Sequence, residues 1–178
     1  MKANKNIVAI PGSLRAGSSN HAILNYLGSL VPAGINYLIY DGLAQLPHFD
    51  PGLDNENLPA AVSELRKLLA EADGVIICSP EYAYGVPGSL KNLLDWTVGS
   101  DSLEGRPLAL ITASTGGEHA HAALKLVLKS ALGANLSEGT ALLIPFVRSK
   151  INGNGNIVDT GTKESLQNVF TAFMSPLE

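Results

Sequence analysis

Cysteine is almost absent from this chain of 178 residues, which contains only Cys78. A single cysteine excludes an intramolecular disulfide and any metal site built from several cysteines. Cys78 ends the apolar segment 75–78, so we expect it in the core. A catalytic thiol would need an accessible and electropositive setting, which this position does not predict.

Long apolar runs and an excess of basic charge are also missing. No run approaches the length of a membrane span, and residues 1–6 contain no apolar signal segment. The net charge of −4 argues against a nucleic-acid-binding surface. We therefore expect a cytoplasmic protein that binds neither membrane nor nucleic acid. The length and an ordinary composition, 46% hydrophobic and 16% charged, predict a single domain over 1–178.

Short apolar segments alternate with amphipathic ones along the whole chain. Strands are predicted at 7–10, 35–40, 75–78, 108–112 and 142–144, and helices at 20–31, 59–72, 89–98, 118–133 and 162–173. The last strand begins near Leu136 in an alternative assignment. Strands that are apolar throughout are typical of parallel sheets covered on both sides. We therefore predict an α/β three-layer sandwich, a five-stranded parallel sheet with helices on both faces.

Three segments carry more specific expectations. In the helix over 118–133, the spacing predicts a buried face made of Ala123, Leu126, Val127 and Ala131. Its two histidines, His119 and His121, point in different directions on a helix, which disfavours a metal pair.

The segment 41–59 is rich in Pro, Gly, Asp and Asn and predicts a long irregular loop. His48 and Phe49 in its middle are candidates to cover a ligand or a partner subunit, and a plain surface excursion is an equal alternative. The segment 150–159 predicts a small hairpin or an exposed turn.

A polar loop of small residues, Gly12-Ser13-Leu14-Arg15-Ala16-Gly17-Ser18-Ser19-Asn20, separates the first strand from the first helix. This layout presents backbone N–H groups and a helix N-terminus to an anion. Its hydroxyls, amide and guanidinium are donors that suit a phosphate. The loop is neither a P-loop nor a G-x-G-x-x-G fingerprint. On these residues alone, an ordinary capped loop is an equal alternative.

Two further loops follow the third and fourth strands, Ser79 to Gly88 and Ala113 to Glu118. Tyr82 or Tyr84 in the first of them suits packing beside a planar heteroaromatic ring. The alternative is a rigid turn with two partly buried tyrosines. In open parallel sheets, ligands bind beyond the carboxyl ends of the strands. All three loops are therefore expected to meet at one edge of the sheet.

At these loops the chain resembles the NADPH-dependent FMN reductase family, which includes bacterial quinone, chromate and azo-dye reductases of flavodoxin-like fold. The resemblance extends from Ile7 to about Phe173. It is carried by the loop 12–20, by Pro80-Glu81-Tyr82, and by Val86-Pro87-Gly88-Ser89-Leu90-Lys91-Asn92 with Asp95-Trp96.

The resemblance implies non-covalently bound FMN held by the three loops. The residues implied are Ser13, Arg15, Ser18, Ser19 and Asn20 on the phosphate, Pro80, Glu81, Tyr82, Ala83 and Tyr84 along the isoalloxazine, and Ser114, Thr115, Gly116 and Gly117 on its other side. Many relatives have Asn where this chain has Ala83, so a backbone contact is retained there and a side-chain amide contact is lost. No metal ligand and no catalytic side chain is implied, because the hydride chemistry belongs to the cofactor.

The resemblance also implies NADPH or NADH as electron donor and a small-molecule acceptor. The hypothesis is that hydride passes from nicotinamide to flavin, and that an acceptor then replaces the nicotinamide. Quinones, azo compounds, metal oxyanions and free flavin are the acceptor classes. A homodimer or homotetramer is implied, with the loop 41–59 and the helix carrying Trp96 as candidate contacts. The alternatives are a flavodoxin-type electron carrier without NAD(P)H turnover and a non-catalytic phosphate- or nucleotide-binding module.

Overall fold

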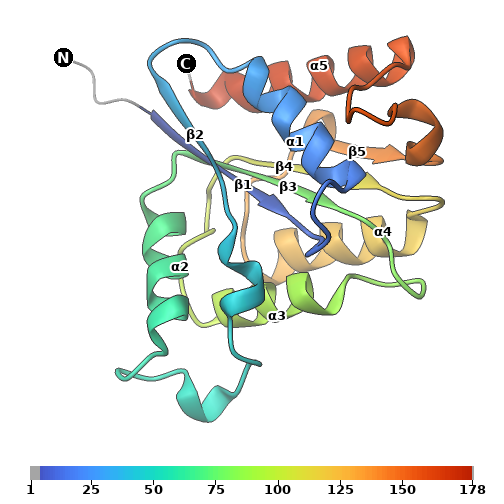
Figure 1. Ribbon diagram of the computed structural model, residues 1–178. Coiled ribbons are helices and arrows are strands. Elements are labelled where there is room, and N and C mark those ends of the chain that lie inside the picture. Colours follow the sequence, from blue (N-terminus) through green and yellow to red (C-terminus); the bar gives the residue numbers. More distant parts are fainter. Residues whose placement is uncertain (1–4, 178) are drawn as a thin grey trace.

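The computed structural model describes residues 5–177, which form a parallel sheet between two layers of helices (Figure 1). The sheet has the strand order β2-β1-β3-β4-β5. Its strands are β1 (Lys5–Pro11), β2 (Ile35–Ile39), β3 (Gly74–Ser79), β4 (Leu108–Ala113) and β5 (Ala141–Ile144). The chain changes its direction of winding between β1 and β3, as in flavodoxin-like folds. The predicted five-stranded parallel sheet is confirmed.

Two separate apolar clusters fill the space on either side of the sheet. The helices α1 (Ser19–Ser29) and α5 (Thr160–Met174) cover one face, and α2 (Ala60–Ala70), α3 (Gly88–Val98) and α4 (Glu118–Leu126) cover the other (Figure 1). Successive strand residues point to opposite faces. Val8 and Ile10 therefore pack with α2, α3 and α4, whereas Ile7 and Ala9 pack with α1 and α5. Burial on both faces explains why the central strands are apolar throughout.

Capping residues set where the helices begin. Ser18 caps α1 by accepting a hydrogen bond from the backbone N–H of His21. Asp159 caps α5 by accepting from the N–H of Thr162 at 2.8 Å, so α5 begins two residues before the predicted start. Pro59 and Pro87, which cannot donate a backbone hydrogen bond, stand immediately before α2 and α3. In the part of the chain that the structure describes, no helix has the length and apolarity to cross a bilayer.

The predicted buried face of the fourth helix is largely wrong, since Leu126 and Ala131 are exposed and only the half-buried Val127 packs against the core. The residues that face the sheet are Ala120, Leu124 and Leu128, whereas Leu126 has 66% of its surface exposed. The predicted residues and the observed ones both repeat at helical spacing, so the sequence pattern alone does not determine which set faces the sheet. The helix also continues as a π-helical turn over Val127–Ala131, which changes the spacing of its last residues.

Two predictions for the C-terminal third have different outcomes. β5 begins at Ala141, because Glu138–Thr140 forms a 3-10 turn, so the alternative start near Leu136 is wrong. The small hairpin within 150–159 is confirmed by an antiparallel bridge between Ile151 and Ile157.

The segment 41–59 is more ordered than predicted. It contains two 3-10 turns, Gly42–Gln45 and Pro51–Leu53. It packs on α3, where the indole N–H of Trp96 donates to the carbonyl of Pro47 at 2.8 Å. The ring of Phe49 meets the Trp96 ring edge-on, with 5.0 Å between centroids. Trp96 is fully buried in its own chain and is not available to a partner subunit.

Candidate functional site

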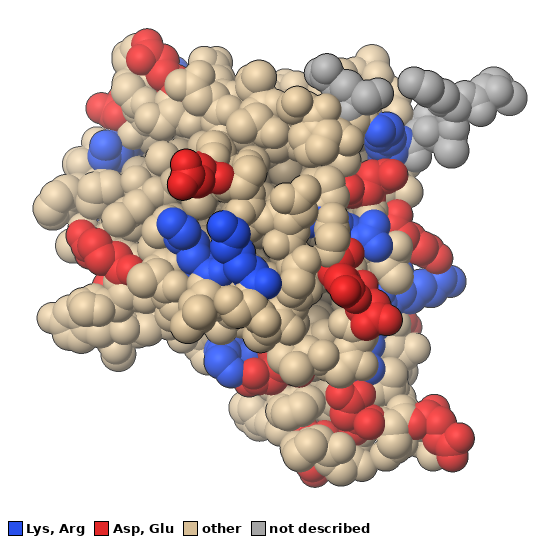
Figure 2. Space-filling view, turned by 180° about the vertical axis from the view of Figure 1, so that it is seen from behind, with Lys and Arg blue, Asp and Glu red and all other residues tan. Residues whose placement is uncertain are grey.

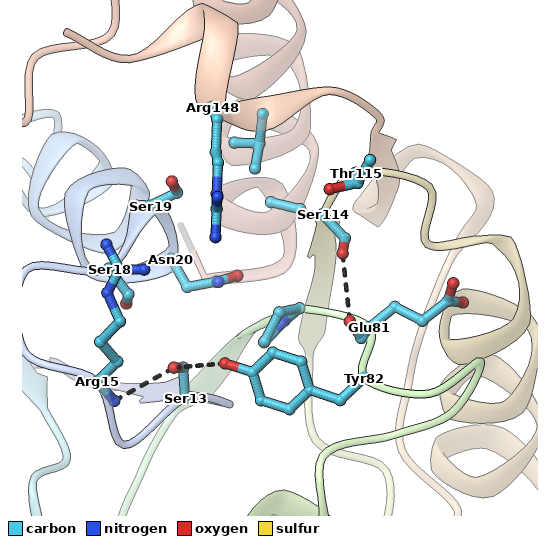
Figure 3. A pocket seen from close by; sticks show the side chains of 13 residues that line it. Ser13, Arg15, Ser18, Ser19, Asn20, Glu81, Tyr82, Ser114, Thr115 and Arg148 are labelled. Carbon is cyan, nitrogen blue, oxygen red and sulfur yellow. Dashed lines mark hydrogen bonds between the residues drawn. The ribbon is translucent and has the colours of Figure 1, made fainter.

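The loops that follow β1, β3 and β4 meet at the carboxyl edge of the sheet, as expected for this topology. Between them lies a pocket of about 240 Å³ (Figure 3). The residues that line it are Ser13, Arg15, Ser18, Ser19, Asn20, Pro80, Glu81, Tyr82, Ala113, Ser114, Thr115, Val147 and Arg148.

Most of the residues predicted for the site line this pocket, and four do not. Ala83 and Tyr84 form the tip of an exposed turn beyond it, and Tyr84 has 80% of its surface exposed. Gly116 and Gly117 belong to the end of the third loop that does not line the pocket, where Gly117 precedes the first residue of α4.

Sequence reasoning missed Ala113, Val147 and Arg148. The signal that could have found the last two is their place just after β5, since the rule about carboxyl ends applies to every parallel strand.

A close backbone contact brings the first loop against the second. The N–H of Gly12 donates to the carbonyl of Cys78 at 2.8 Å. A Cβ at position 12 would lie 2.9 Å from the Cα of Ser79, so only glycine fits without a shift. The hydroxyls of Ser13 and Tyr82 then lie 3.1 Å apart and join the two loops across the pocket (Figure 3).

The buried side chain of Asn20 is oriented by the single cysteine. The Cys78 thiol donates to Oδ1 of Asn20 at 3.2 Å. Burial raises the pKa of the Cys78 thiol, which therefore stays neutral and remains a donor. Because the amide oxygen of Asn20 is occupied, its NH₂ group is left to donate into the pocket. The expected core cysteine thus also positions a polar group of the site.

The charged groups of the pocket favour an anion. Arg15 and Arg148 approach it from different sides (Figure 3). Within residues 5–177, no carboxylate forms an ion pair with either guanidinium. The N-terminus of α1 adds first-turn N–H groups that have no intrahelical acceptor. Glu81, the one carboxylate in the lining, turns away from the pocket centre in Figure 3.

The second loop contains a two-residue hairpin turn between Tyr82 and Gly85. The backbones of Tyr82 and Gly85 exchange hydrogen bonds of 3.1 and 2.9 Å. Ala83 and Tyr84 between them have φ values of 48° and 58°. Positive φ at both central positions is the requirement of a type I′ turn, which glycine and asparagine meet most easily.

Side-chain contacts tie this turn to the third loop and to α4. A Glu81 carboxylate oxygen accepts from the N–H of Ala120 at 2.8 Å. Gly117, at the N-cap of α4, has no side chain to do this, so Glu81 caps the helix from another loop. The hydroxyl of Ser114 donates to the Glu81 carbonyl at 3.4 Å. The rings of Tyr84 and His119 meet edge-on, with centroids 5.5 Å apart.

The two histidines of α4 have different surroundings. His119 packs on Tyr84, whereas Nδ1 of His121 lies 2.9 Å from the hydroxyl of Thr112 on β4. Partial burial, with the nearby charge of Lys125, lowers the pKa of His121 from its ordinary 6.5. No cluster of three or more His, Cys, Asp or Glu in residues 5–177 is arranged to hold a metal ion.

A sequence profile of the NADPH-dependent FMN reductases matches residues 5–147. The chain belongs to this family. It is 32% identical to a quinone reductase of Escherichia coli K12, over 97% of this chain and 95% of that protein. It is 33% identical to a 2-hydroxy-1,4-benzoquinone reductase of a Burkholderia species, with 90% of each chain covered.

The fold of a solved flavoenzyme supports the same assignment. The NAD(P)H:(acceptor) oxidoreductase FerB from Paracoccus denitrificans superposes with a TM-score of 0.82 at 28% identity, over 96% of each chain. Family membership confirms the predicted oxidoreductase class, the flavodoxin-like fold, and FMN with NAD(P)H as cofactors.

The pocket fits FMN on its own chemistry. One end combines hydroxyls, an oriented amide, guanidinium groups and a helix N-terminus, which together suit a phosphomonoester. The other end is bounded by Tyr82 and by a backbone turn held in place through Glu81. A dianionic tail and a flat ring system match these two ends.

Proposed function

We propose that this protein is an NAD(P)H-dependent FMN reductase that passes electrons from a nicotinamide to a quinone. The observation that carries the proposal is the meeting, in one pocket, of a phosphate-type loop after β1 with the loop after β3 that contains Tyr82. Two relatives that are 32% and 33% identical, both named as quinone reductases, support the acceptor class.

The phosphate end of the pocket holds the tail of FMN in this proposal. Arg15 supplies charge, and the buried Ser13, Ser18 and Asn20 supply donors with fixed directions. Ser19 adds a hydroxyl at the first position of α1. Charged hydrogen bonds to phosphate are about twice as strong as neutral ones, so this end dominates the affinity.

The ring end of the pocket orients the isoalloxazine. Pro80, Glu81 and Tyr82 lie along one side of it, and Ser114 and Thr115 lie along the other. When bound, FMN supplies a ring that accepts hydride and passes electrons on, which no side chain does. The hydrogen bonds between the backbones of Tyr82 and Gly85 hold the turn that bounds this end in a fixed position.

No side chain is assigned as an acid or a base. Glu81 is the only carboxylate that lines the pocket, and it is engaged in capping α4. Chemistry by hydride and electron transfer agrees with this lack of a proton-transferring group. The role of the protein is to bind, orient and polarise.

The assembly state and cellular location extend the proposal. We propose a homodimer or homotetramer in the cytoplasm. The large exposed apolar side chains of Tyr84 and Leu126, on the turn and on α4, support a contact between subunits. Sedimentation of the purified protein at several concentrations tests this part separately.

The visible spectrum of the purified protein, reconstituted with FMN, tests the main proposal. NADPH or NADH, added without oxygen, is expected to bleach the flavin absorbance, and a benzoquinone is expected to restore it. Bound FMN without bleaching would favour the flavodoxin-type carrier.

On the face shown in Figure 2, Lys and Arg are interspersed with Asp and Glu, which does not suggest the strongly acidic docking surface of a carrier. A protein that takes up no FMN would instead favour the non-catalytic phosphate-binding module.

A matched pair of variants tests the phosphate end. Arg15→Ala is expected to weaken FMN binding roughly 10- to 100-fold, because a charged hydrogen bond to phosphate is lost. Lys67→Ala, on α2, is the control, since the Lys67 side chain is 76% exposed and pairs only weakly with Glu71. Unchanged FMN affinity in Arg15→Ala would contradict the phosphate assignment.

A further inference from the structure

The segment that follows β5 has an unusual backbone. Phe146 has φ 53° and ψ 36°, which is the left-handed region. A bulky aromatic residue rarely adopts this conformation, which persists only where the surrounding structure fixes it. Phe146 gains no burial in return, because 66% of its surface is exposed.

Backbone hydrogen bonds to the third loop hold the segment in this conformation. The N–H of Phe146 donates to the carbonyl of Thr115 at 3.1 Å, and the N–H of Val147 donates to the carbonyl of Ser114 at 3.0 Å. The side chain of Val147 is buried at the edge of the pocket. The segment is therefore a fourth loop at the same edge of the sheet, fixed by the loop that follows β4.

The consequence of this turn is the direction of Arg148. Its side chain extends from the 3-10 turn Val147–Lys150 into the pocket, toward Asn20, from the side opposite to the first loop (Figure 3). No carboxylate within residues 5–177 pairs with it, whereas its neighbour Lys150 lies 3.7 Å from Asp159. The guanidinium of Arg148 is therefore free to pair with an anion that binds in the pocket.

We propose that Arg148 is the second cation of the phosphate end and makes the pocket selective for a terminal phosphomonoester. The proposal rests on the proposed function, because FMN is the ligand concerned. A phosphomonoester carries about two negative charges at neutral pH. Arg15 and Arg148 together match that charge, and each presents a planar fork that suits phosphate oxygens. The pair distinguishes FMN from riboflavin, which has the same ring and no phosphate.

Binding of FMN and of riboflavin to the same variants tests this proposal. The dissociation constants are measured by quenching of flavin fluorescence for the parent protein, Arg148→Ala, Arg148→Lys and the control Lys67→Ala. Arg148→Ala is expected to weaken FMN binding about tenfold and to change riboflavin binding less than about twofold. Arg148→Lys keeps the positive charge and loses the planar fork of donors. Its FMN affinity is therefore expected to lie between those of the parent protein and Arg148→Ala.

Inorganic phosphate provides a probe that contains no ring. It is expected to compete with FMN in the parent protein and to compete less well in Arg148→Ala. Because Arg148 is exposed, the variants are expected to fold, which circular dichroism verifies.

Two results would overturn the assignment of Arg148 while leaving the proposed function intact. One is an unchanged FMN affinity in Arg148→Ala. The other is an equal loss for FMN and riboflavin, which would place the effect away from the phosphate. Failure of the parent protein to bind FMN would instead overturn the proposed function, and this inference with it.

Discussion

The two ends of the pocket are built by different means. The phosphate end consists of side-chain donors on a loop whose central residues, from Leu14 to Gly17, are exposed to solvent. The ring end consists of backbone in a hairpin turn, which is tied to α4 through Glu81 and to the third loop through Ser114. The loop at the phosphate end thus provides charge and hydrogen-bond donors, and the hairpin turn at the ring end provides backbone that is held in a fixed position.

This difference separates affinity from positioning. Changes to Arg15 or Arg148 at the phosphate end should alter how tightly the ligand binds while leaving the fold stable, because neither side chain forms an ion pair within residues 5–177. Changes at the ring end should alter stability together with ligand orientation, because the same contacts serve both. The variants below test whether this separation holds, starting with the residue where the two ends meet.

Gly12→Ala is expected to give the largest effect, because Gly12 joins the two ends. The added Cβ would lie 2.9 Å from the backbone of Ser79. Overpacking against backbone typically costs up to about 3 kcal/mol in the free energy of unfolding. We expect a loss of about that size in urea denaturation, together with weaker FMN binding, since the Ser13–Tyr82 contact would be displaced.

Gly88→Ala is the matched control. Gly88 begins α3, its φ is not positive, and a Cβ there meets nothing within 4 Å. Alanine favours helices, so this change is expected to be neutral or stabilising by up to about 1 kcal/mol. Equal destabilisation by both substitutions would show that the close approach at Gly12 is not the cause.

Glu81→Ala should separate the ring end from the phosphate end. Loss of a helix cap costs about 0.5–2 kcal/mol, and here the cap also joins the turn to α4. We expect about 1 kcal/mol lower stability, with riboflavin and FMN binding weakened by the same factor. Glu81→Gln keeps an oxygen acceptor and should recover most of the stability. A loss of affinity confined to FMN would contradict the separation of the two ends.

Ala83→Asn should stabilise the turn at the ring end. Ala83 has φ 48°, a conformation that costs an ordinary L-residue about 1–2 kcal/mol and that asparagine tolerates better. An increase of about 0.5–1 kcal/mol in unfolding free energy is expected. The control Ala122→Asn, at an exposed site within α4, should lose a few tenths of a kcal/mol, because asparagine is a weaker helix former. If both variants lost stability, the turn would not be strained.

The phosphate end was more predictable from sequence than the ring end. Ser13, Arg15 and Asn20 stand within nine residues of one loop, and the alternation of strand and helix alone places that loop at the sheet edge. The convergence of the loops after β3 and β4 followed from the same rule.

What could not be predicted depends on contacts between distant residues. The capping role of Glu81 requires knowing that Ala120 lies beside it, 39 residues away. The place of Arg148 after β5 was a usable signal, but the direction of its side chain follows a left-handed Phe146, which no local propensity favours. The buried face of α4 was wrong because two sets of apolar residues had the same spacing, and packing on the sheet decided between them.

Acid is expected to loosen the support behind the third loop, with the smallest effect of this series. His121 on α4 faces Thr112 at the end of β4, and its pKa is lowered first by burial and then by the charge of Lys125. Between the ordinary value of 6.5 and the lower folded value, the unfolded chain binds more protons than the folded one. Stability therefore falls as the pH drops through this window and levels off below it.

Urea denaturation at pH 7.5 and at pH 5.5 measures this dependence. In His121→Gln, the part of the stability difference between the two pH values that comes from the histidine should disappear. In Lys125→Ala it should shrink, because the pKa of His121 would rise toward its ordinary value once the neighbouring charge is removed. The contact between Glu81 and Ala120 joins the turn at the ring end to α4. Loosening of α4 is therefore expected to lower riboflavin affinity over the same pH range. A riboflavin affinity that stays constant while stability falls would mean that α4 does not hold the turn in place.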